Sequence, residues 1–290
     1  MNLPTNTPQP TQPPNPTLPP PTATIPEPQP AAGGGSALVR LLIFVQFTLT
    51  EYLRSGRIWI EVGASAACFV VFLRPLGGGG IQADQFFLIM GLFMLGLAVY
   101  TMSSTLALGD RPQGYVVLAR QPEQVSYLLG LFLSAILFLT TVYTTLSLLT
   151  ALTGGLGGTD VRGWLLGSLP LLLNVALLCA LLVLLSPLVL TTFWRLFVLS
   201  LIALAFSSSF FGSARIDSFD PLVQNILRGV QTILSWPLVP AFSGFALAIS
   251  RDYSGAAAVI PIAQFALLVA LLSLALFTFG RREVLLSSVG

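Results

Sequence analysis

Long apolar runs, separated by short polar segments, repeat along most of the chain. A helix needs about 20 apolar residues to cross the hydrocarbon of a bilayer. Six runs approach or exceed that length, and we expect each to be a span: residues 58–75, 86–108, 125–153, 164–186, 193–212 and 255–280. The pattern predicts an all-α polytopic membrane protein with six transmembrane helices.

The segment before the first span, residues 37–55, is amphipathic instead of uniformly apolar. A projection at about 100° per residue places its leucines on one face and its charged side chains on the other. The uncharged run between Arg40 and Glu51 is too short to cross a membrane. We therefore predict an N-terminal amphipathic helix, an elbow helix, that lies in the membrane interface.

Residues 213–254 allow more than one interpretation. Asp220-Pro221 is typical of a helix start, with a capping carboxylate and a proline at the first helical position. A long uncharged stretch follows, but Pro237 and Pro240 near its middle argue against a continuous seventh span. We predict re-entrant or external helices in this segment, before the last span.

The arginines favour an even number of spans, because basic residues concentrate in cytoplasmic loops. With six spans, both termini lie in the cytoplasm and the protein is a multi-pass component of the cytoplasmic (inner) membrane. A seventh span would move the two C-terminal arginines outside. The arginines expected inside are Arg40, Arg54, Arg57, Arg111, Arg120, Arg195, Arg281 and Arg282, and those expected outside include Arg162, Arg215, Arg228 and Arg251.

Composition agrees with a membrane protein and excludes several kinds of chemistry. Hydrophobic residues make up 54% of the chain and charged residues 8%, with a mean hydropathy of +0.86; soluble domains carry about 25% charged residues. The chain has neither lysine nor histidine, so it lacks the groups for a phosphate-binding loop lysine, a Schiff base or a histidine-ligated metal. Cys68 and Cys179 lie in apolar runs. We expect no enzyme activity, no cofactor and no metal site.

Residues 1–36 form a separate region: 12 of the 21 prolines lie in the first 30 residues, mixed with threonine, asparagine and glutamine. Such a composition cannot bury a core. We predict a disordered Pro/Thr-rich cytoplasmic tail, followed by a membrane domain over residues 37–290.

The loop between the second and third spans, residues 109–124, combines charges and prolines with an apolar patch. We expect Gly114 to Arg120 to form a short amphipathic helix. An exposed apolar patch on a cytoplasmic loop usually marks a binding surface for another protein. The alternative is an ordinary interfacial loop whose apolar side chains dip into lipid.

The residues of this loop resemble those of a known family. The motif consists of Asp110-Arg111, Gly114, Leu118, Pro122 and Leu128-Leu129-Gly130. It is similar to the loop in membrane (permease) subunits of ABC-2 type ABC transporters, although Asp110 stands where glutamate is commoner, Tyr115 where threonine is usual, and Leu131 where lysine is frequent. The resemblance covers about residues 37 to 283.

In that family the loop is a coupling helix that inserts into a separate ATPase subunit, and two permease chains work with two ATPases as an exporter. The resemblance therefore implies that Tyr115, Val117 and Leu118 are buried in the ATPase while Arg111 and Arg120 set the register. It also implies a homodimer or heterodimer of permease chains. Beyond those partners we expect membrane lipid and no nucleic acid.

Two further groups of residues are candidates for function. Glu61 follows Arg57 by four residues, the spacing of a helical ion pair, and we favour that structural pair over a proton relay. Ser134, Thr141 and Thr145 form a hydroxyl stripe on the third span, a candidate lining of a transport path for a polar substrate. Such hydroxyls often bond the backbone of their own helix instead.

Two other functions remain as alternatives. An ion-coupled secondary transporter would require intramembrane acids, of which Glu61 is the candidate. A scaffold subunit that transports nothing needs no motif at all.

Overall fold

In the computed structural model, the described residues are 37–74, 80–109, 124–153, 156–158, 160–200, 202, 229 and 239–287. The predicted tail, nearly all of the predicted coupling loop, about half of the predicted fifth span and most of the segment 213–254 lie outside the described residues. Residues 192–200, which include the first part of the predicted fifth span, are helical.

The described residues are mainly helical, which confirms the predicted all-α class. The helices are α1 (Ala37–Arg54), α2 (Ile58–Cys68), α3 (Ala83–Gly109), α5 (Gln124–Thr153), α6 (Val161–Leu184), α9 (Val239–Ser250) and α10 (Ile260–Ser287), with a π-helical turn η1 (Phe69–Leu73) after α2 and a 3-10 turn η3 (Gly255–Val259) before α10. Two short strands, β1 (Ile81–Gln82) and β2 (Leu156–Gly157), pair in parallel between the loop before α3 and the loop after α5.

Within the described residues, four helical segments are long and apolar enough to cross a membrane, namely α3, α5, α6 and η3 with α10. They coincide with four of the predicted spans. The first predicted span falls on α2 and η1, which reach the required length only together with α1, and a bend of 78° separates α1 from α2. The protein is therefore a multi-pass membrane protein with four described spans, or five if this bent pair counts as one.

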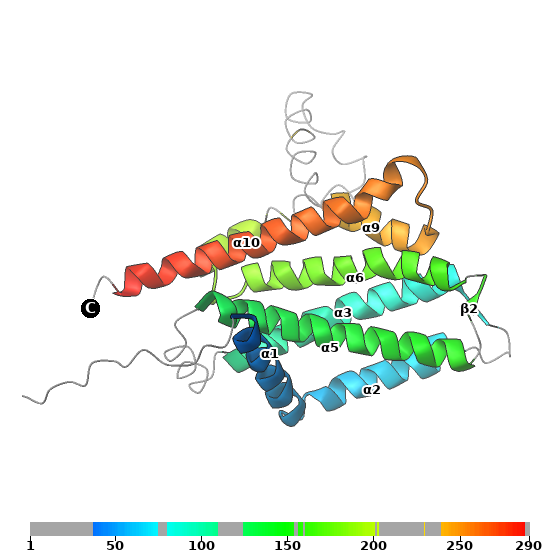
Figure 1. The fold of residues 1–290 in the computed structure, drawn as a ribbon, viewed down its shortest axis with the longest axis horizontal. Coiled ribbons are helices and arrows are strands. Elements are labelled where there is room, and N and C mark those ends of the chain that lie inside the picture. The colour runs from blue at the N-terminus through cyan, green and yellow to red at the C-terminus, as the bar shows by residue number, and fades with distance from the viewer. Residues whose placement is uncertain are drawn as a thin grey trace, which may run out of the picture. The chain divides into compact units, whose positions relative to one another are not determined.

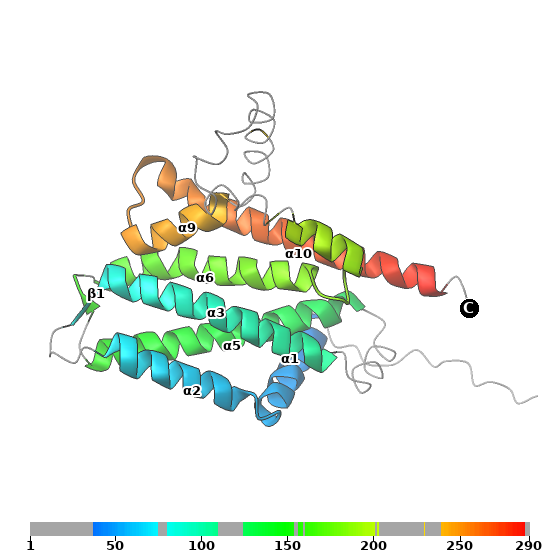
Figure 2. The same ribbon diagram turned by 180° about the vertical axis from the view of Figure 1, so that it is seen from behind.

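The core lies between α3, α5 and α6, which run side by side (Figure 1). α9 and α10 pack on α6, while α2 lies beyond α3 and α5 (Figures 1 and 2). α3 contributes many of the fully buried side chains and is apolar on every face, as a central helix must be. The fully buried core side chains include Phe86, Phe87, Met90, Met94, Met102, Leu128, Leu139 and Leu171.

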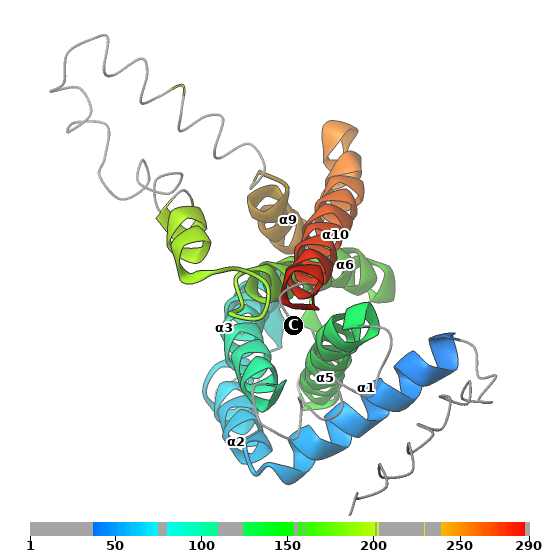
Figure 3. The same cartoon turned by 90° about the vertical axis from the view of Figure 1, so that its left-hand side faces the viewer.

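The amphipathic helix α1 lies across the first turns of α5 (Figure 3). Phe44 on α1 meets Tyr127 on α5 with their ring centroids 5.3 Å apart. A Cβ atom at Gly130 would lie 2.2 Å from Cδ1 of Phe44, so the absence of a side chain at Gly130 is what lets α1 approach. Other apolar side chains of α1, such as Leu38 and Leu42, are exposed and are available to lipid.

Candidate functional site

The turn between α1 and α2 brings a buried carboxylate against two hydroxyl groups. Gly56 adopts a φ of 74°, a conformation that glycine enters without steric cost, and the chain turns there by 78°. The turn places Tyr52, in the last turn of α1, beside Glu61, in the first turn of α2. The Tyr52 hydroxyl donates to Oε1 of Glu61 at 2.5 Å, and the Thr101 hydroxyl of α3 donates to the same oxygen.

Glu61 is 1% exposed, and its second oxygen, Oε2, has no hydrogen-bond partner among the described residues. An unpaired buried acceptor costs about 1–3 kcal/mol. A buried polar atom without a partner lowers the stability of the fold, and such atoms are found most often at functional sites. Glu61 is therefore the first candidate for a functional residue.

The ion pair expected between Arg57 and Glu61 is not formed in the described part of the chain. Nη1 of Arg57 instead donates to the backbone carbonyl of Ser104 at 3.1 Å. The prediction assumed that both residues lie inside one helix, but α2 begins at Ile58. Arg57 belongs to the turn, so its side chain reaches α3 while Glu61 faces Tyr52 and Thr101.

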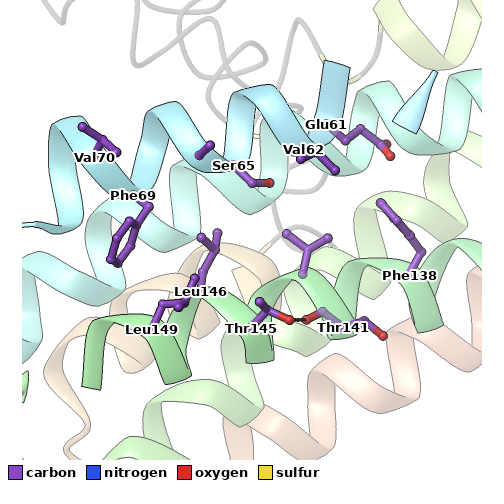
Figure 4. A pocket seen from close by; sticks show the side chains of 12 residues that line it. Glu61, Val62, Ser65, Phe69, Val70, Phe138, Thr141, Thr145, Leu146 and Leu149 are labelled. Carbon is purple, nitrogen blue, oxygen red and sulfur yellow. Dashed lines mark hydrogen bonds between the residues drawn. The ribbon is translucent and has the colours of Figure 1, made fainter. Parts of the chain in front are cut away.

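A pocket of about 390 Å³ lies between α2 with η1 and α5, and Glu61 stands at one end of it (Figure 4). Its lining is almost entirely apolar apart from Glu61, Ser65, Thr141 and Thr145. The Ser65 hydroxyl is buried and has no partner among the described residues. The pocket is therefore an apolar space with a small group of polar atoms, the usual composition of a ligand-binding site.

The structure separates the three hydroxyl residues predicted for a transport path. Thr141 and Thr145 line the pocket with Glu61. Ser134 is buried on the same helix beside a small cavity of about 10 Å³ that Tyr52 and Thr101 also line. All three hydroxyls donate to carbonyls of α5 itself, those of Leu131, Leu137 and Thr141, which is the alternative that the sequence left open.

A second polar cluster joins α6, α9 and α10. Gln264 on α10 is fully buried, and its Nε2 donates to Oδ1 of Asn174 at 2.8 Å and to the Pro170 carbonyl at 3.2 Å. Nδ2 of Asn174 donates to the Ala241 carbonyl on α9 at 2.9 Å. A Cβ atom at Gly244 would lie 1.9 Å from Nε2 of Gln264, so only glycine fits there. The three helices are thus cross-linked by side-chain amides.

The same region supplies a hydrogen bond that the proline in α6 removes. Pro170 has no N–H group, so the carbonyl of Leu166, four residues earlier, loses its helical donor. The Tyr253 hydroxyl, from the loop after α9, donates to that carbonyl at 2.6 Å. Burial raises the pKa of Tyr253, which keeps the phenol protonated and able to donate.

The loop after α9 is also tied to the start of α3. Arg251, at a φ of 55°, pairs with Asp84 and lies 5.9 Å from the ring centroid of Phe87. The sequence analysis missed this cluster and the amides. The sequence does contain signals for them: Pro170, Asn174 and Gln264 each lie within an apolar run, and a proline or a side-chain amide needs hydrogen-bond partners nearby when it lies inside a membrane.

The residues predicted to contact an ATPase, Asp110, Arg111, Gly114, Tyr115, Val117, Leu118 and Arg120, lie outside the described residues. The helices on either side are described. α3 ends at Gly109 and α5 begins at Gln124, at the end of the bundle where α1 crosses (Figure 2). These two helix ends therefore lie at the same end of the bundle as the contact of Phe44 with Gly130.

In the described part of the chain, no group of three or more histidine, cysteine, aspartate or glutamate side chains is placed where it could hold a metal ion. Cys68 and Cys179 are buried and unbridged. Comparisons of the chain with protein-family models, with curated proteins and with solved structures found no significant match.

Proposed function

We propose that the protein is the membrane-spanning permease subunit of an ATP-driven ABC-2 type exporter. It works with a separate ATPase subunit and a second permease chain in the cytoplasmic membrane, with both termini in the cytoplasm. The proposal is supported by the motif between Asp110 and Gly130 and by a multi-pass helical bundle. The chain itself has no lysine for a phosphate-binding loop, so the proposal assigns ATP hydrolysis to a partner.

The observation that carries the proposal is the contact between α1 and the start of α5. Gly130, the last residue of the motif, is where Phe44 of α1 packs. This gives the glycine of the motif a physical purpose, because any side chain there would push α1 away. The contact joins α1 to the first turns of α5, the helix that follows the predicted coupling loop, so a displacement of α5 driven by an ATPase would reach α1 and, through the turn at Gly56, α2.

The proposal includes the finer topology. α1 is the elbow helix in the membrane interface, and six spans follow. α9, with 12 residues, is about 18 Å long at 1.5 Å per residue and is too short to cross a hydrocarbon layer of about 30 Å. We assign it as part of a re-entrant segment, since its Ala241 carbonyl accepts a hydrogen bond from Nδ2 of Asn174 on α6.

Copurification and reconstitution test the proposal. The tagged protein is purified from its native membranes, and the copurified proteins are assayed for ATP hydrolysis and, in liposomes, for ATP-dependent transport. We expect an ATPase to copurify with the native chain and to be lost in Leu118→Asp. The control is Leu18→Asp, the same change in the N-terminal region that the family resemblance does not cover. Retention of the ATPase by Leu118→Asp, or its absence from the native preparation, would refute the proposal.

One observation favours a second function, that of an ion-coupled secondary transporter. Glu61 is a buried carboxylate with an unpaired oxygen beside a pocket, as expected for a group that binds and releases a coupling ion. Transport driven by a proton or sodium gradient in vesicles without ATP, and abolished by Glu61→Gln, would establish this function and displace the first.

A further inference from the structure

The pocket between α2 and α5 changes in character along its length. Glu61 and Thr141 lie toward one end of the pocket and Ser65 lies near its middle, whereas Phe69, Val70 and Leu149 lie toward the other end (Figure 4). From Glu61 to Val70 the helix rises about 13 Å at 1.5 Å per residue. The pocket thus has the shape and polarity of a site for an elongated molecule with one polar end.

The polar atoms of the pocket are rich in acceptors and poor in donors. Oε2 of Glu61 is unpartnered, and the Ser65 hydroxyl oxygen is unpartnered as well. Thr141 already donates its single hydroxyl proton to the Leu137 carbonyl, so toward the pocket it can only accept. The Ser65 hydroxyl can donate or accept, but a ligand that satisfies Glu61 and Thr141 must bring hydrogen-bond donors, and a positively charged one would also offset the carboxylate.

The pocket is accessible from the side of the bundle. Val62 and Val70 on the α2 side and Leu149 on the α5 side are exposed although they line it. Its volume of about 390 Å³ falls within the range of about 300–1,000 Å³ that is common for small-molecule sites. A molecule dissolved in the membrane can enter without crossing the helical core.

We propose that this pocket binds an amphipathic amine from the lipid phase, with its ammonium group on Glu61, Ser65 and Thr141 and its apolar chain along η1 and the second half of α5. An ammonium group supplies three donors and a positive charge, which matches the unpartnered oxygens of Glu61 and Ser65. The other half of the carboxylate is held by Tyr52 and Thr101, so Glu61 is already oriented before the ligand arrives. The binding needs no ATPase and does not rest on the proposed function.

Equilibrium binding of radiolabelled dodecylamine to the full chain in phosphatidylcholine nanodiscs tests the proposal, since this lipid has no N–H group of its own. Dodecanol and dodecanoate serve as the neutral and the anionic probe of equal chain length. We expect saturable binding of the amine at neutral pH, at least tenfold weaker binding of the alcohol, and no saturable binding of the carboxylate.

Two variants and one control locate the site. Glu61→Gln keeps an acceptor for Tyr52 and Thr101 but removes the charge, and we expect it to weaken amine binding at least tenfold. Ala66→Phe fills the pocket from its wall and should abolish binding of the amine and of the alcohol. Glu51→Gln, which neutralises an exposed carboxylate on α1, should leave the affinity unchanged.

The proposal is overturned if dodecanol binds as tightly as dodecylamine, if either Glu61→Gln or Ala66→Phe binds the amine as the native chain does, or if the native chain shows no saturable binding. Should Glu61→Gln fail to fold, as judged by gel filtration, the comparison of the three probes and the Ala66→Phe variant decide the question.

Discussion

Replacing Gly130 by alanine tests how closely α1 is packed on α5. The new methyl group would lie 2.2 Å from Cδ1 and 2.7 Å from Cε1 of Phe44, far inside van der Waals contact. Phe44 is itself buried in a small cluster with Tyr127 and Leu131, so its ring has little room to retreat. Overpacking of this kind costs about 1–3 kcal/mol.

The measured loss in the free energy of unfolding of Gly130→Ala should be smaller than this overpacking cost, because alanine is favoured over glycine in a helix by about 0.8–1.0 kcal/mol. A matched control removes this contribution. Gly96 lies within α3, and a Cβ atom there meets nothing within 4 Å. Gly96→Ala should therefore be neutral or stabilising, and Gly130→Ala should be less stable than Gly96→Ala by about 1–3 kcal/mol.

The assay is reversible unfolding in mixed micelles, followed by circular dichroism, for the two single variants. Phe44→Ala provides the second half of a double-mutant cycle, since without the ring the clash disappears. In the Phe44→Ala background, Gly130→Ala should therefore change the free energy of unfolding by the same amount as Gly96→Ala does. Equal stability of Gly130→Ala and Gly96→Ala in the native background would show that α1 does not pack on α5 as described.

The remaining predictions concern the loop after α9, which holds Tyr253, and the turn at Gly56 between α1 and α2. Tyr253→Phe leaves the Leu166 carbonyl unpaired and should lower the free energy of unfolding by about 1–3 kcal/mol. The loss should be smaller in a Pro170→Ala background, because alanine restores the helical N–H that this carbonyl lacks. An equal loss in both backgrounds would contradict this account. Gly56→Ala forces a side chain into a φ of 74° and should cost about 1 kcal/mol in the same unfolding assay, whereas Gly63→Ala, where the helix has open space, should not; similar values for the two would show that the turn has no strain.

The sequence predicted the long helices well because their ends are marked by charges, prolines and glycines. The predicted spans 86–108 and 125–153 differ by only a few residues from α3 (Ala83–Gly109) and α5 (Gln124–Thr153). An uncharged apolar run has no stable alternative inside a bilayer, since only a helix satisfies its backbone without water.

The partners of Glu61 could not be predicted in this way. Helical spacing proposed Arg57, whereas the structure supplies Tyr52 and Thr101 from two other helices. Which side chain a buried group meets depends on the angle between helices, and that angle is set here by the turn at Gly56. A sequence shows the turn residue but not the direction in which the chain leaves it.

The hydroxyl stripe on α5 illustrates the same limit. Ser134 and Thr141 are seven residues apart and lie on nearly the same helical face, so the sequence grouped them. They are also about 10 Å apart along the helix axis. Ser134 lies at the level of α1, where Tyr52 lines the neighbouring cavity, and Thr141 lies past it, where α5 faces α2 across the pocket.

The amide cross-links of α6, α9 and α10 constrain any working cycle of the protein. Pulling these helices apart would strand Asn174 and Gln264 in hydrocarbon, where no solvent can replace the lost hydrogen bonds. Low-energy rearrangements must therefore carry the three helices together as one rigid block. α2, which is joined to α1 through the turn at Gly56, lies outside this block and is not held by its amides.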